Sequence, residues 1–306
     1  MLASDSAQLP RVSAVIVSYN TRDALVACVS SLEGEIPFPF EVIVVDNASA
    51  DQSAEAVALI HPLVRVVKNG ENRGFAVGCN QGLRLSRAPY VLLINSDAEV
   101  RAGAVLALVG VLDAQPGVAL VGPRTLNADG TAQLSFGPSL RPWSEWRQRR
   151  LVQGIRRRDA GTMRRVEARA SREHEPDWLS GSCLLARRSA LESVGLLDEG
   201  FFLYEEDVDL CLRLRRAGWR IVFTPRGEVV HRLGASMETA PSRARLEYHR
   251  SHLYFYRKHN GSVLTGLLRA WMVASGCLAW VAARLPNDRP DARAEALEEL
   301  RLGLRG

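Results

Sequence analysis

The sequence predicts an α/β fold in which a mostly parallel sheet carries helices on both faces. Two features of residues 10–125 support this prediction. Short apolar runs alternate with stretches of helical periodicity, as in repeated βαβ units. The apolar runs are also too continuously hydrophobic for strands with one solvated face, so they belong inside a parallel sheet. A predominantly helical region follows near the C-terminus.

The first half of the chain alternates strands and helices in a regular order. After the first strand, Thr21 is a candidate helix N-cap, and the helix it opens carries Leu25, Val29 and Leu32 at helical spacing. The expected strands span residues 12–17, 41–45, 63–67, 90–94 and 118–121. The later helices span residues 54–60, 75–85 and 102–112.

Four further elements are expected beyond the middle of the chain. A strand, a short helix, a longer helix and a second strand span residues 178–186, 188–195, 203–218 and 219–224. Gly181 lies in the first strand, where the backbone must approach another group closely, and Pro225 stops the last strand. The longer helix is expected to bury Val208, Cys211, Leu212 and the stem of Arg215.

Most of the net charge lies in residues 141–176. This segment holds 11 Arg against 5 Asp or Glu, a net charge of +6, while the whole chain carries +5. Because it has few aliphatic residues, we expect a mobile insertion. Two interpretations stay open: a solvated arginine-rich loop or helix, or a surface for an anionic partner such as lipid phosphate or a pyrophosphate-linked acceptor. Since the rest of the chain is close to neutral, no nucleic-acid partner is expected.

The C-terminal region combines an aromatic-rich helix pattern over residues 248–259 with a nearly apolar stretch over 262–285. The uncharged centre of this stretch, residues 270–283, has 14 residues. A bilayer span requires roughly 18–20. Two interpretations stay open: a helix packed on the rest of the protein, and a helix in the membrane plane with Trp271 and Trp280 at the interface.

Composition limits the class of protein. A hydrophobic fraction of 47% supports a sizeable core, and 24% charged residues are ordinary for a soluble enzyme. Residues 1–10 are short and polar, so a secretory signal is not expected. The five cysteines show no paired metal-ligand spacing, which favours reduced, mostly buried thiols in the cytoplasm.

Polar residues follow three of the expected strands: Ser18-Tyr19-Asn20, Asp46-Asn47-Ala48-Ser49 and Asn95-Ser96-Asp97. Sheets of this kind bind ligands beyond the carboxyl ends of their strands, so we expect one shared site. Asp97 is a suitable oxygen ligand for a divalent cation, and Asn95 lies on the same face. An ordinary turn or helix cap is the alternative interpretation of Asn-Ser-Asp.

A second acidic group opens the helix expected at residues 203–218. Glu205, Glu206, Asp207 and Asp209 place four carboxylates within five positions. The helix amides favour their charged forms, whereas burial and mutual repulsion oppose them. Asp207 is the candidate general base for a substrate hydroxyl. An acidic first turn favoured by the helix dipole is the alternative.

His231 and Arg73 extend the candidate site. His231 follows a short apolar strand, and imidazole is a good ligand for a manganese-like ion, although a structural histidine is the alternative. Arg73-Gly74 precedes a helix that contains Asn80. An arginine at a helix N-terminus suits an anionic diphosphate, and a flexible loop is the alternative.

Together these stretches resemble a family-2 glycosyltransferase of the GT-A fold, whose sheet is Rossmann-like. The resemblance runs from Val12 to Gly234 and continues more weakly to Gly261. It rests on residues 15–20, 44–49, 72–76, 92–97, 178–181, 201–209 and His231. Within the family, the motifs are most similar to those of bacterial dTDP-rhamnosyltransferases, and galactofuranosyl- and other hexosyltransferases share them.

The resemblance implies a role for each motif. The implied donor-binding residues are Tyr19, Asn20, Asp46, Asn47, Arg73, Gly74, Asn80, Asn95 and Ser96. Tyr19, Asp46 and Asn47 would hold the base and ribose. Asp97 and His231 would coordinate Mg²⁺ or Mn²⁺. Asp207, with Glu206 beside it, would be the base of a single in-line displacement that inverts the anomeric centre.

One position departs from the family pattern. The family usually has two aspartates in its metal motif, and here the first is Asn95. Because only one carboxylate remains, the ligand set and the strength of the metal dependence stay open.

The expected organisation is a GT-A domain over residues 10–235 and a helical, membrane-associating region over 236–306. The domain would contain a nucleotide-binding half to residue 125, the basic insertion, and an acceptor and catalytic half over 177–235. It would transfer a sugar, L-rhamnose from dTDP-L-rhamnose in the first instance or a hexose or galactofuranose from a UDP-sugar, to a hydroxyl acceptor. That acceptor would be a glycan or a polyprenyl-diphosphate-linked molecule in cell-wall or surface polysaccharide synthesis.

The sequence also bears on the location of the protein and on two rival functions. We expect a cytoplasmic protein with peripheral contact at the inner face of the cell membrane, and a homodimer stays open. A nucleotidyltransferase would want a glycine- and lysine-rich phosphate loop, which residues 18–21 do not offer. A non-catalytic sugar-nucleotide binding module would keep its function without Asp207.

Overall fold

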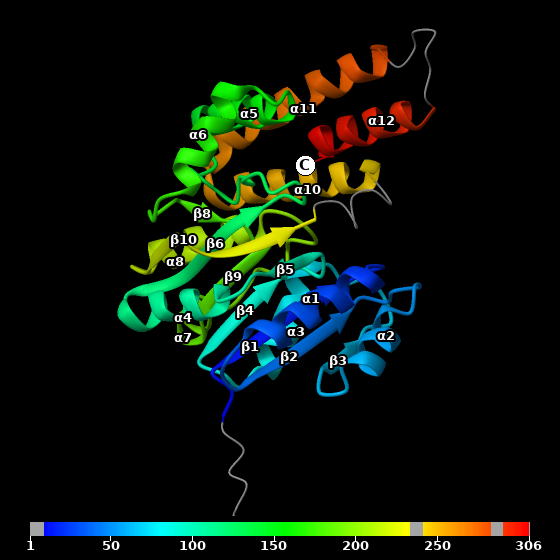
Figure 1. The fold of residues 1–306 in the computed structure, drawn as a ribbon. Coiled ribbons are helices and arrows are strands. Elements are labelled where there is room, and N and C mark those ends of the chain that lie inside the picture. Colours follow the sequence, from blue (N-terminus) through cyan, green and yellow to red (C-terminus); the bar gives the residue numbers. More distant parts are fainter. Residues whose placement is uncertain (1–8, 233–240, 283–289, 306) are drawn as a thin grey trace, which may run out of the picture.

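A computed structural model of the chain describes residues 9–232, 241–282 and 290–305. Its centre is an eight-stranded sheet with the order β3-β2-β1-β4-β9-β6-β10-β5 (Figure 1). These strands are β1 (Val12–Ser18), β2 (Phe40–Asp46), β3 (Arg65–Lys68), β4 (Tyr90–Ile94), β5 (Ala98–Val100), β6 (Val118–Leu126), β9 (Cys183–Arg187) and β10 (Arg220–His231). A separate pair joins β7 (Phe136–Gly137) to β8 (Trp178–Leu179).

Strand directions and helix positions confirm the predicted fold class. Strand β1 is parallel to β2 and β4, β2 to β3, and β6 to β10. Strand β9 is antiparallel to β4 and β6, and β5 is antiparallel to β10. One face packs on α1 (Arg22–Glu35), α2 (Ser53–Ile60) and α4 (Ala104–Ala114). The other packs on α3 (Phe75–Leu85), α7 (Arg188–Ser193) and α8 (Glu206–Arg216).

Strand β1 shows why its residues are almost all apolar. Ala14 and Ile16 belong to the core cluster on the α1 face, whereas Val15 belongs to the cluster on the α3 face. The side chains of this strand pack alternately against helices on the two faces of the sheet, so apolar residues are favoured at almost every position. Gly78 and Gly82 let α3 lie directly against Val17 and Val15.

In the second half of the chain, the structure differs from the prediction in three places. Residues 178–186 do not form one strand, because the chain leaves β8 at Leu179, turns through Gly181, and enters the main sheet as β9. Strand β10 continues past Pro225, because a register shift between Thr224 and Glu228 places the proline in a bulge. The short strand β5, which the sequence analysis missed, pairs with the end of β10.

The core face of α8 also differs from the prediction. Val208 and Cys211 are buried as expected, but Leu210 and Leu214 take the places expected for Leu212 and Arg215. Leu212 is half-buried and Arg215 is exposed, forming an ion pair with Asp177.

The basic segment contains two helices, so of the loop or helix left open by the sequence the helix is correct. These are α5 (Pro142–Arg156) and α6 (Ala160–Ala170). The Asp159 carboxylate caps α6 by accepting from the amide of Thr162 at 2.7 Å. Leu151 and Val166 pack with the core cluster on the α3 face, so a few well-placed aliphatic residues order the pair.

The C-terminal region is helical, as predicted. It consists of α10 (Pro241–His259), α11 (Gly261–Ala282) and α12 (Pro290–Arg305). In Figure 1 these helices lie with α5 and α6 above the sheet. A third apolar cluster, with Phe201, Leu253 and Met272 among its members, joins them to the loop before α8.

Helix α11 is longer as an apolar element than the sequence analysis counted. The stretch Gly261–Val281 is long and apolar enough to cross a membrane, with a mean hydropathy of 1.4 and 22% of its most apolar window buried. Leu268 and Met272 are buried inside the protein, whereas Leu267 and Leu278 are exposed.

The packing of α3 on β1 gives a stability prediction. A Cβ on Gly82 would lie 2.3 Å from Cγ1 of Val15, whereas Gly110 in α4 has no such atom within 4 Å. We expect Gly82→Ala to lower the free energy of unfolding by about 1–3 kcal/mol. Gly110→Ala should raise it by up to about 1 kcal/mol through helix propensity. Urea denaturation checks both, and equal effects of the two variants would contradict the packing.

Candidate active site

The polar ends of β1, β2 and β4 meet at one edge of the sheet, as predicted. The hydroxyl of Thr21 lies 3.0 Å from that of Ser18 and donates to that of Ser96 at 2.9 Å. The amide of Asn47 donates to the carbonyl of Ser18 at 2.9 Å. Thr21 does occupy the N-cap position of α1, but its side chain links two strand ends and does not cap the helix amides.

Asn95, Asp97 and His231 form one cluster. The imidazole Nε2 of His231 lies 3.2 Å from Asp97 Oδ1 and 3.3 Å from Asn95 Nδ2. Strand β10 carries His231 to this place because its last residues pair with β5, directly after Asp97 in the chain. Both side chains are mostly buried, with 9% of His231 and 12% of Asp97 exposed.

Gln133 determines the tautomer of His231. The amide nitrogen of Gln133 donates to Asn127 at 2.9 Å, so its Oε1 faces His231 Nδ1 at 2.9 Å and accepts the ring proton. His231 Nε2 and Asp97 Oδ1 are then two acceptors that face each other. A divalent cation between them satisfies both, so these residues fit a metal ion. Among the described residues no group of three or more His, Cys, Asp or Glu forms such a site, and the remaining ligands would come from substrate and water.

The end of β2 offers a buried acceptor. Asp46 Oδ2 accepts from the amide of Ser49 at 3.1 Å, while Oδ1 is buried without a hydrogen-bond partner. Such an atom is unfavourable unless a ligand supplies a donor. Tyr19 is 38% exposed at the end of β1. Asn20 Oδ1 accepts from the backbone amide of Ala50 at 2.7 Å, and the backbone amide of Asn20 donates to the Ser49 hydroxyl at 2.9 Å.

Asn47 and Gly74 shape the start of α3. Asn47 Nδ2 donates to the carbonyl of Gly74 at 3.0 Å, and its Oδ1 accepts from Asn69 at 2.8 Å. Gly74 has φ +86°, and a Cβ there would lie 2.5 Å from the carbonyl oxygen of Phe202. Only glycine fits this contact. Arg73 beside it is exposed. Asn47 therefore supports the turn, and a direct contact with nucleotide stays a prediction.

Asn80 has a structural role in this fold. It is buried in α3, its Nδ2 donates to the carbonyl of Leu197 and to Glu199 at 2.9 Å each, and its Oδ1 accepts from the amide of Leu197 at 3.1 Å. These bonds occupy its polar atoms and fasten α3 to the loop before α8. The placement does not support the expected contact with a donor.

Asp207 is held by two backbone amides at the start of α8. Oδ2 accepts from Gly181 at 2.6 Å and Oδ1 from Val208 at 2.8 Å. The predicted close approach at Gly181 is therefore to the candidate base itself. Burial raises the pKa of Asp207, and the two amides oppose that rise only in part.

The neighbouring acids have different environments. Glu206 is buried with Oε2 unpartnered, and burial together with the charge of Asp207 raises its pKa well above the ordinary value. Glu206 therefore keeps its proton more readily than Asp207. Asp209 is fully buried on another side of the helix, where it bonds Arg213, Lys258 and His259 at 2.6 Å each. It anchors α10 and does not face the site.

Glu205, His252 and Glu145 form a buried ion triad. His252 Nδ1 lies 2.6 Å from Glu205, and its Nε2 lies 3.2 Å from Glu145. Burial opposes the charged imidazole, but the two carboxylates outweigh it and raise the pKa of His252 to about 9. The triad joins the start of α8 to α10 and α5. The roles of Glu145, Gln133 and His252 were not predicted, because no local sequence pattern connects residues so far apart in the chain.

The site as a whole combines a carboxylate proton acceptor, a pair of metal-type ligands and an unpartnered buried acceptor. These groups belong to residues at or just after the ends of β2, β4 and β10 and at the start of α8. They suit a reaction in which an anionic leaving group departs while a hydroxyl loses its proton.

Comparisons with known proteins agree with this chemistry. Residues 13–195 match glycosyl transferase family 2. The chain is 31% identical to an N-acetylglucosaminyl-diphospho-decaprenol L-rhamnosyltransferase of Mycobacterium tuberculosis, over 81% of this chain and 84% of that protein. It is 26% identical to the low-salt glycan biosynthesis hexosyltransferase Agl10 of Haloferax volcanii, over 68% of this chain and 62% of that protein.

Two solved structures show the same fold. The mannosyltransferase PcManGT from Pyrobaculum calidifontis, in complex with GDP-Man and Mn²⁺, matches with a TM-score of 0.58 at 19% identity, over 97% of this chain and 88% of that chain. GalNAc-T7 with UDP, GalNAc and Mn²⁺ matches with a TM-score of 0.55 at 16% identity, over 82% of this chain and 50% of that chain. These likenesses establish the GT-A fold.

The ion triad predicts how stability depends on pH. The folded protein holds the His252 proton to about pH 9, whereas an ordinary histidine loses it near 6.5. The stabilisation is therefore complete below about pH 6.5 and is lost as pH rises toward 9. Over this range the unfolding free energy of the wild type should fall by about 2–4 kcal/mol relative to His252→Gln.

Glu145→Gln tests the same triad from the other side. It removes one of the two carboxylates that raise the pKa of His252. The pKa of His252 should therefore be lower in this variant. The pH-dependent loss of stability should then be complete at a lower pH than in the wild type. Chemical denaturation at a series of pH values measures all three proteins, and parallel curves would contradict the triad.

Proposed function

Because the chain belongs to glycosyl transferase family 2, we propose that it transfers a sugar from a nucleotide-diphosphate donor to an acceptor hydroxyl, with Asp207 as the general base. The observation that carries this proposal is the environment of Asp207, a half-buried carboxylate oriented by the amides of Gly181 and Val208. Its raised pKa makes it a stronger proton acceptor than an exposed aspartate.

The proposed reaction is a single in-line displacement. Asp207 takes the proton of the acceptor hydroxyl while the hydroxyl oxygen forms a bond to the anomeric carbon. The bond from that carbon to the diphosphate oxygen breaks on the opposite side, so the anomeric configuration is inverted. Burial and the charge of Asp207 raise the pKa of Glu206 well above its ordinary value, which favours its neutral form and limits the negative charge beside the reacting hydroxyl.

Asp97 and His231 are the proposed ligands for Mg²⁺ or Mn²⁺. The facing acceptors His231 Nε2 and Asp97 Oδ1 support this proposal. A bound cation supplies charge neutralisation at the departing diphosphate. Gln133 keeps the imidazole in the tautomer that leaves Nε2 without a proton. The side-chain amide of Asn95, 3.3 Å from Nε2, would have to turn away from that nitrogen when it binds a cation.

The donor is proposed to lie along the ends of β1, β2 and β4. Asp46 Oδ1 would accept from the nucleotide base, and Tyr19 is exposed enough to contact it. Ser96 lies beside Asp97 at the end of β4, and Arg73 lies at the start of α3. Asn20, Asn47 and Gly74 would hold the loops around the donor. In this arrangement residues 10–125 bind the nucleotide and 177–235 provide the base.

The proposed donor is dTDP-L-rhamnose and the proposed acceptor a lipid-linked or glycan hydroxyl in polysaccharide synthesis. The 31% identity to a rhamnosyltransferase whose name carries a diphospho-decaprenol acceptor supports both. The alternative is a hexose or galactofuranose from a UDP-sugar, favoured by the likeness to a hexosyltransferase. A lipid-linked acceptor suits peripheral contact with the inner membrane face through the exposed apolar side chains of α11. A homodimer through α11 would compete with that contact.

The base assignment gives a direct prediction. Asp207→Asn keeps the shape of the side chain and removes its basicity, so the transfer rate should fall by about 100- to 10,000-fold. Affinity for dTDP, measured by isothermal titration calorimetry, should stay close to the wild-type value. Asp198→Asn removes a carboxylate from the loop before α8 and should keep transfer. Full turnover by Asp207→Asn would end the assignment.

The assignment of Asp97 and His231 as metal ligands gives a second prediction. In a thermal-shift screen of dTDP-, UDP- and GDP-sugars, stabilisation of the wild type by the preferred donor should increase with Mn²⁺. Asp97→Asn and His231→Ala should lose this increase, and Gln133→Leu should weaken Mn²⁺ affinity by about 10- to 100-fold. Asp23→Asn, a fully exposed acid in α1, is the control. An unchanged Mn²⁺ response in Asp97→Asn would refute the site.

A further inference from the structure

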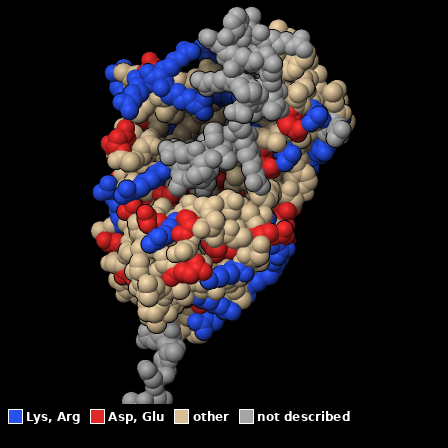
Figure 2. All heavy atoms as spheres, turned by 90° about the vertical axis from the view of Figure 1, so that its right-hand side faces the viewer, with Lys and Arg blue, Asp and Glu red and all other residues tan. Residues whose placement is uncertain are grey.

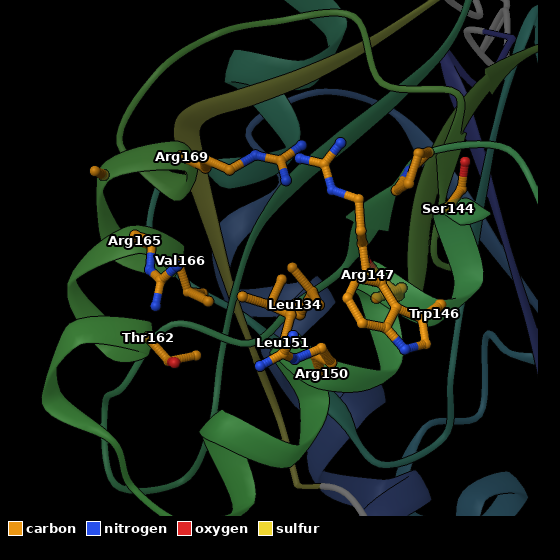
Figure 3. A pocket seen from close by; sticks show the side chains of 13 residues that line it. Leu134, Ser144, Trp146, Arg147, Arg150, Leu151, Thr162, Arg165, Val166 and Arg169 are labelled. Atoms are coloured by element: carbon orange, nitrogen blue, oxygen red, sulfur yellow. The ribbon is translucent and has the colours of Figure 1, made fainter.

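A large cavity lies between α5 and α6, outside the catalytic centre. Its volume is about 1020 Å³, and its walls include Arg147 and Arg150 from α5 and Arg165 and Arg169 from α6. Figure 3 shows Arg147 and Arg169 reaching toward each other across it. Ligand sites usually occupy about 300–1,000 Å³, so this cavity can hold a group much larger than a phosphate.

The four arginines have no ion-pair partner within the part of the chain that the structure describes, and Arg165 acts only at longer range, on Asp159. Among the same residues, Arg165 hydrogen-bonds only the carbonyl of Gly161, at 3.2 Å. Arg150 and Arg169 lie instead over aromatic rings, at 4.9 Å from Trp146 and 5.2 Å from Phe136. Four guanidinium groups around one space, without an ion-pair partner among the described residues, attract an anion with several oxygens.

Other walls of the cavity are apolar. Leu134, Leu151 and Val166 line it, and Figure 3 shows them beneath and beside the guanidinium groups. Leu151 and Val166 also pack with the core, which holds these walls in place. A cavity that is cationic on one side and apolar on the other matches a ligand with an anionic head and an apolar chain.

Two contacts connect the cavity to the catalytic centre. Leu134 in its wall directly follows Gln133, which bonds His231. Pro138, also in the wall, accepts a hydrogen bond from the indole of Trp178 at 2.8 Å, three residues before the Gly181 amide that holds Asp207. A ligand in the cavity therefore lies against the segments that hold both ends of the catalytic centre.

We propose that the arginine cavity binds the diphosphate and the adjoining apolar chain of a lipid-diphosphate acceptor. This inference rests on the proposed function and assigns the acceptor to a place separate from the donor. Arg147, Arg150, Arg165 and Arg169 bind the diphosphate oxygens, and Leu134, Leu151 and Val166 contact the first part of the chain. It also gives the basic segment a purpose that a solvated surface would not have.

The test uses farnesyl diphosphate as the probe, with inorganic pyrophosphate and farnesol in parallel, on the full-length protein. Isothermal titration calorimetry should show farnesyl diphosphate binding more tightly than either. The double variant Arg147→Gln/Arg169→Gln should weaken it by at least about tenfold, as expected for the loss of two charge-assisted contacts. Arg147→Gln alone leaves the contact of Arg169 with Phe136 intact and should weaken binding by a smaller factor.

The matched control is Arg156→Gln/Arg164→Gln. It removes the same charge from the same two helices, but these exposed arginines lie outside the cavity. It should keep farnesyl diphosphate affinity. Equal losses in both double variants would overturn the proposal in favour of general charge attraction, and equal binding of pyrophosphate would overturn the role of the apolar walls.

Binding of dTDP to the same proteins separates this proposal from the proposed function. The cavity variants should bind dTDP as the wild type does. If the wild type binds no nucleotide, the donor assignment fails while the cavity result stands. If dTDP binds and farnesyl diphosphate does not, the cavity proposal alone is overturned.

Discussion

The burial of consecutive carboxyl groups at the start of α8 is the constraint on which the rest of the structure depends. Glu205, Glu206 and Asp207 lose the solvation that water gives a charged group, so each needs a compensating partner or its proton. His252 supplies one partner, the amides of Gly181 and Val208 supply others, and the raised pKa of Glu206 favours its neutral form. Because His252 also pairs with Glu145, the same requirement holds α10 and α5 against α8.

The backbone around the site is strained at several residues with positive φ. Non-glycine residues with positive φ gather there, including Tyr204 at +71° and Glu205 at +65° directly before α8, and Ala48 at +61° after β2. Each costs on the order of 1–3 kcal/mol, which the surrounding contacts must offset. Gly74 also has a positive φ, and it lies against the carbonyl of Phe202 in the loop that leads to α8, where a side chain would not fit. The donor side and the base side of the site are thus joined through backbone contacts.

Local pattern predicted much of the fold and the position of the site, but not the long-range contacts. Strands such as β1 and β4 were predictable because their apolar runs are continuous. The continuation of β10 past Pro225 was not, since a bulge opposite β6 absorbs the proline. Asp97, Asp207 and His231 were proposed from their places at strand and helix ends. Asn20 and Asn80 lie where expected, yet Asn20 Oδ1 and Asn80 Nδ2 bond the protein's own backbone, which spacing does not reveal.

We expect the ion triad to orient Asp207, the proposed general base, and steady-state kinetics of His252→Gln measure this effect. His252 pairs with Glu205, two residues before Asp207, and with Glu145 in α5, so its loss should disturb Asp207 and spare the donor. The kcat should fall by at least about tenfold while KM for the donor stays near the wild-type value. An unchanged kcat, or a loss confined to donor KM, would contradict it.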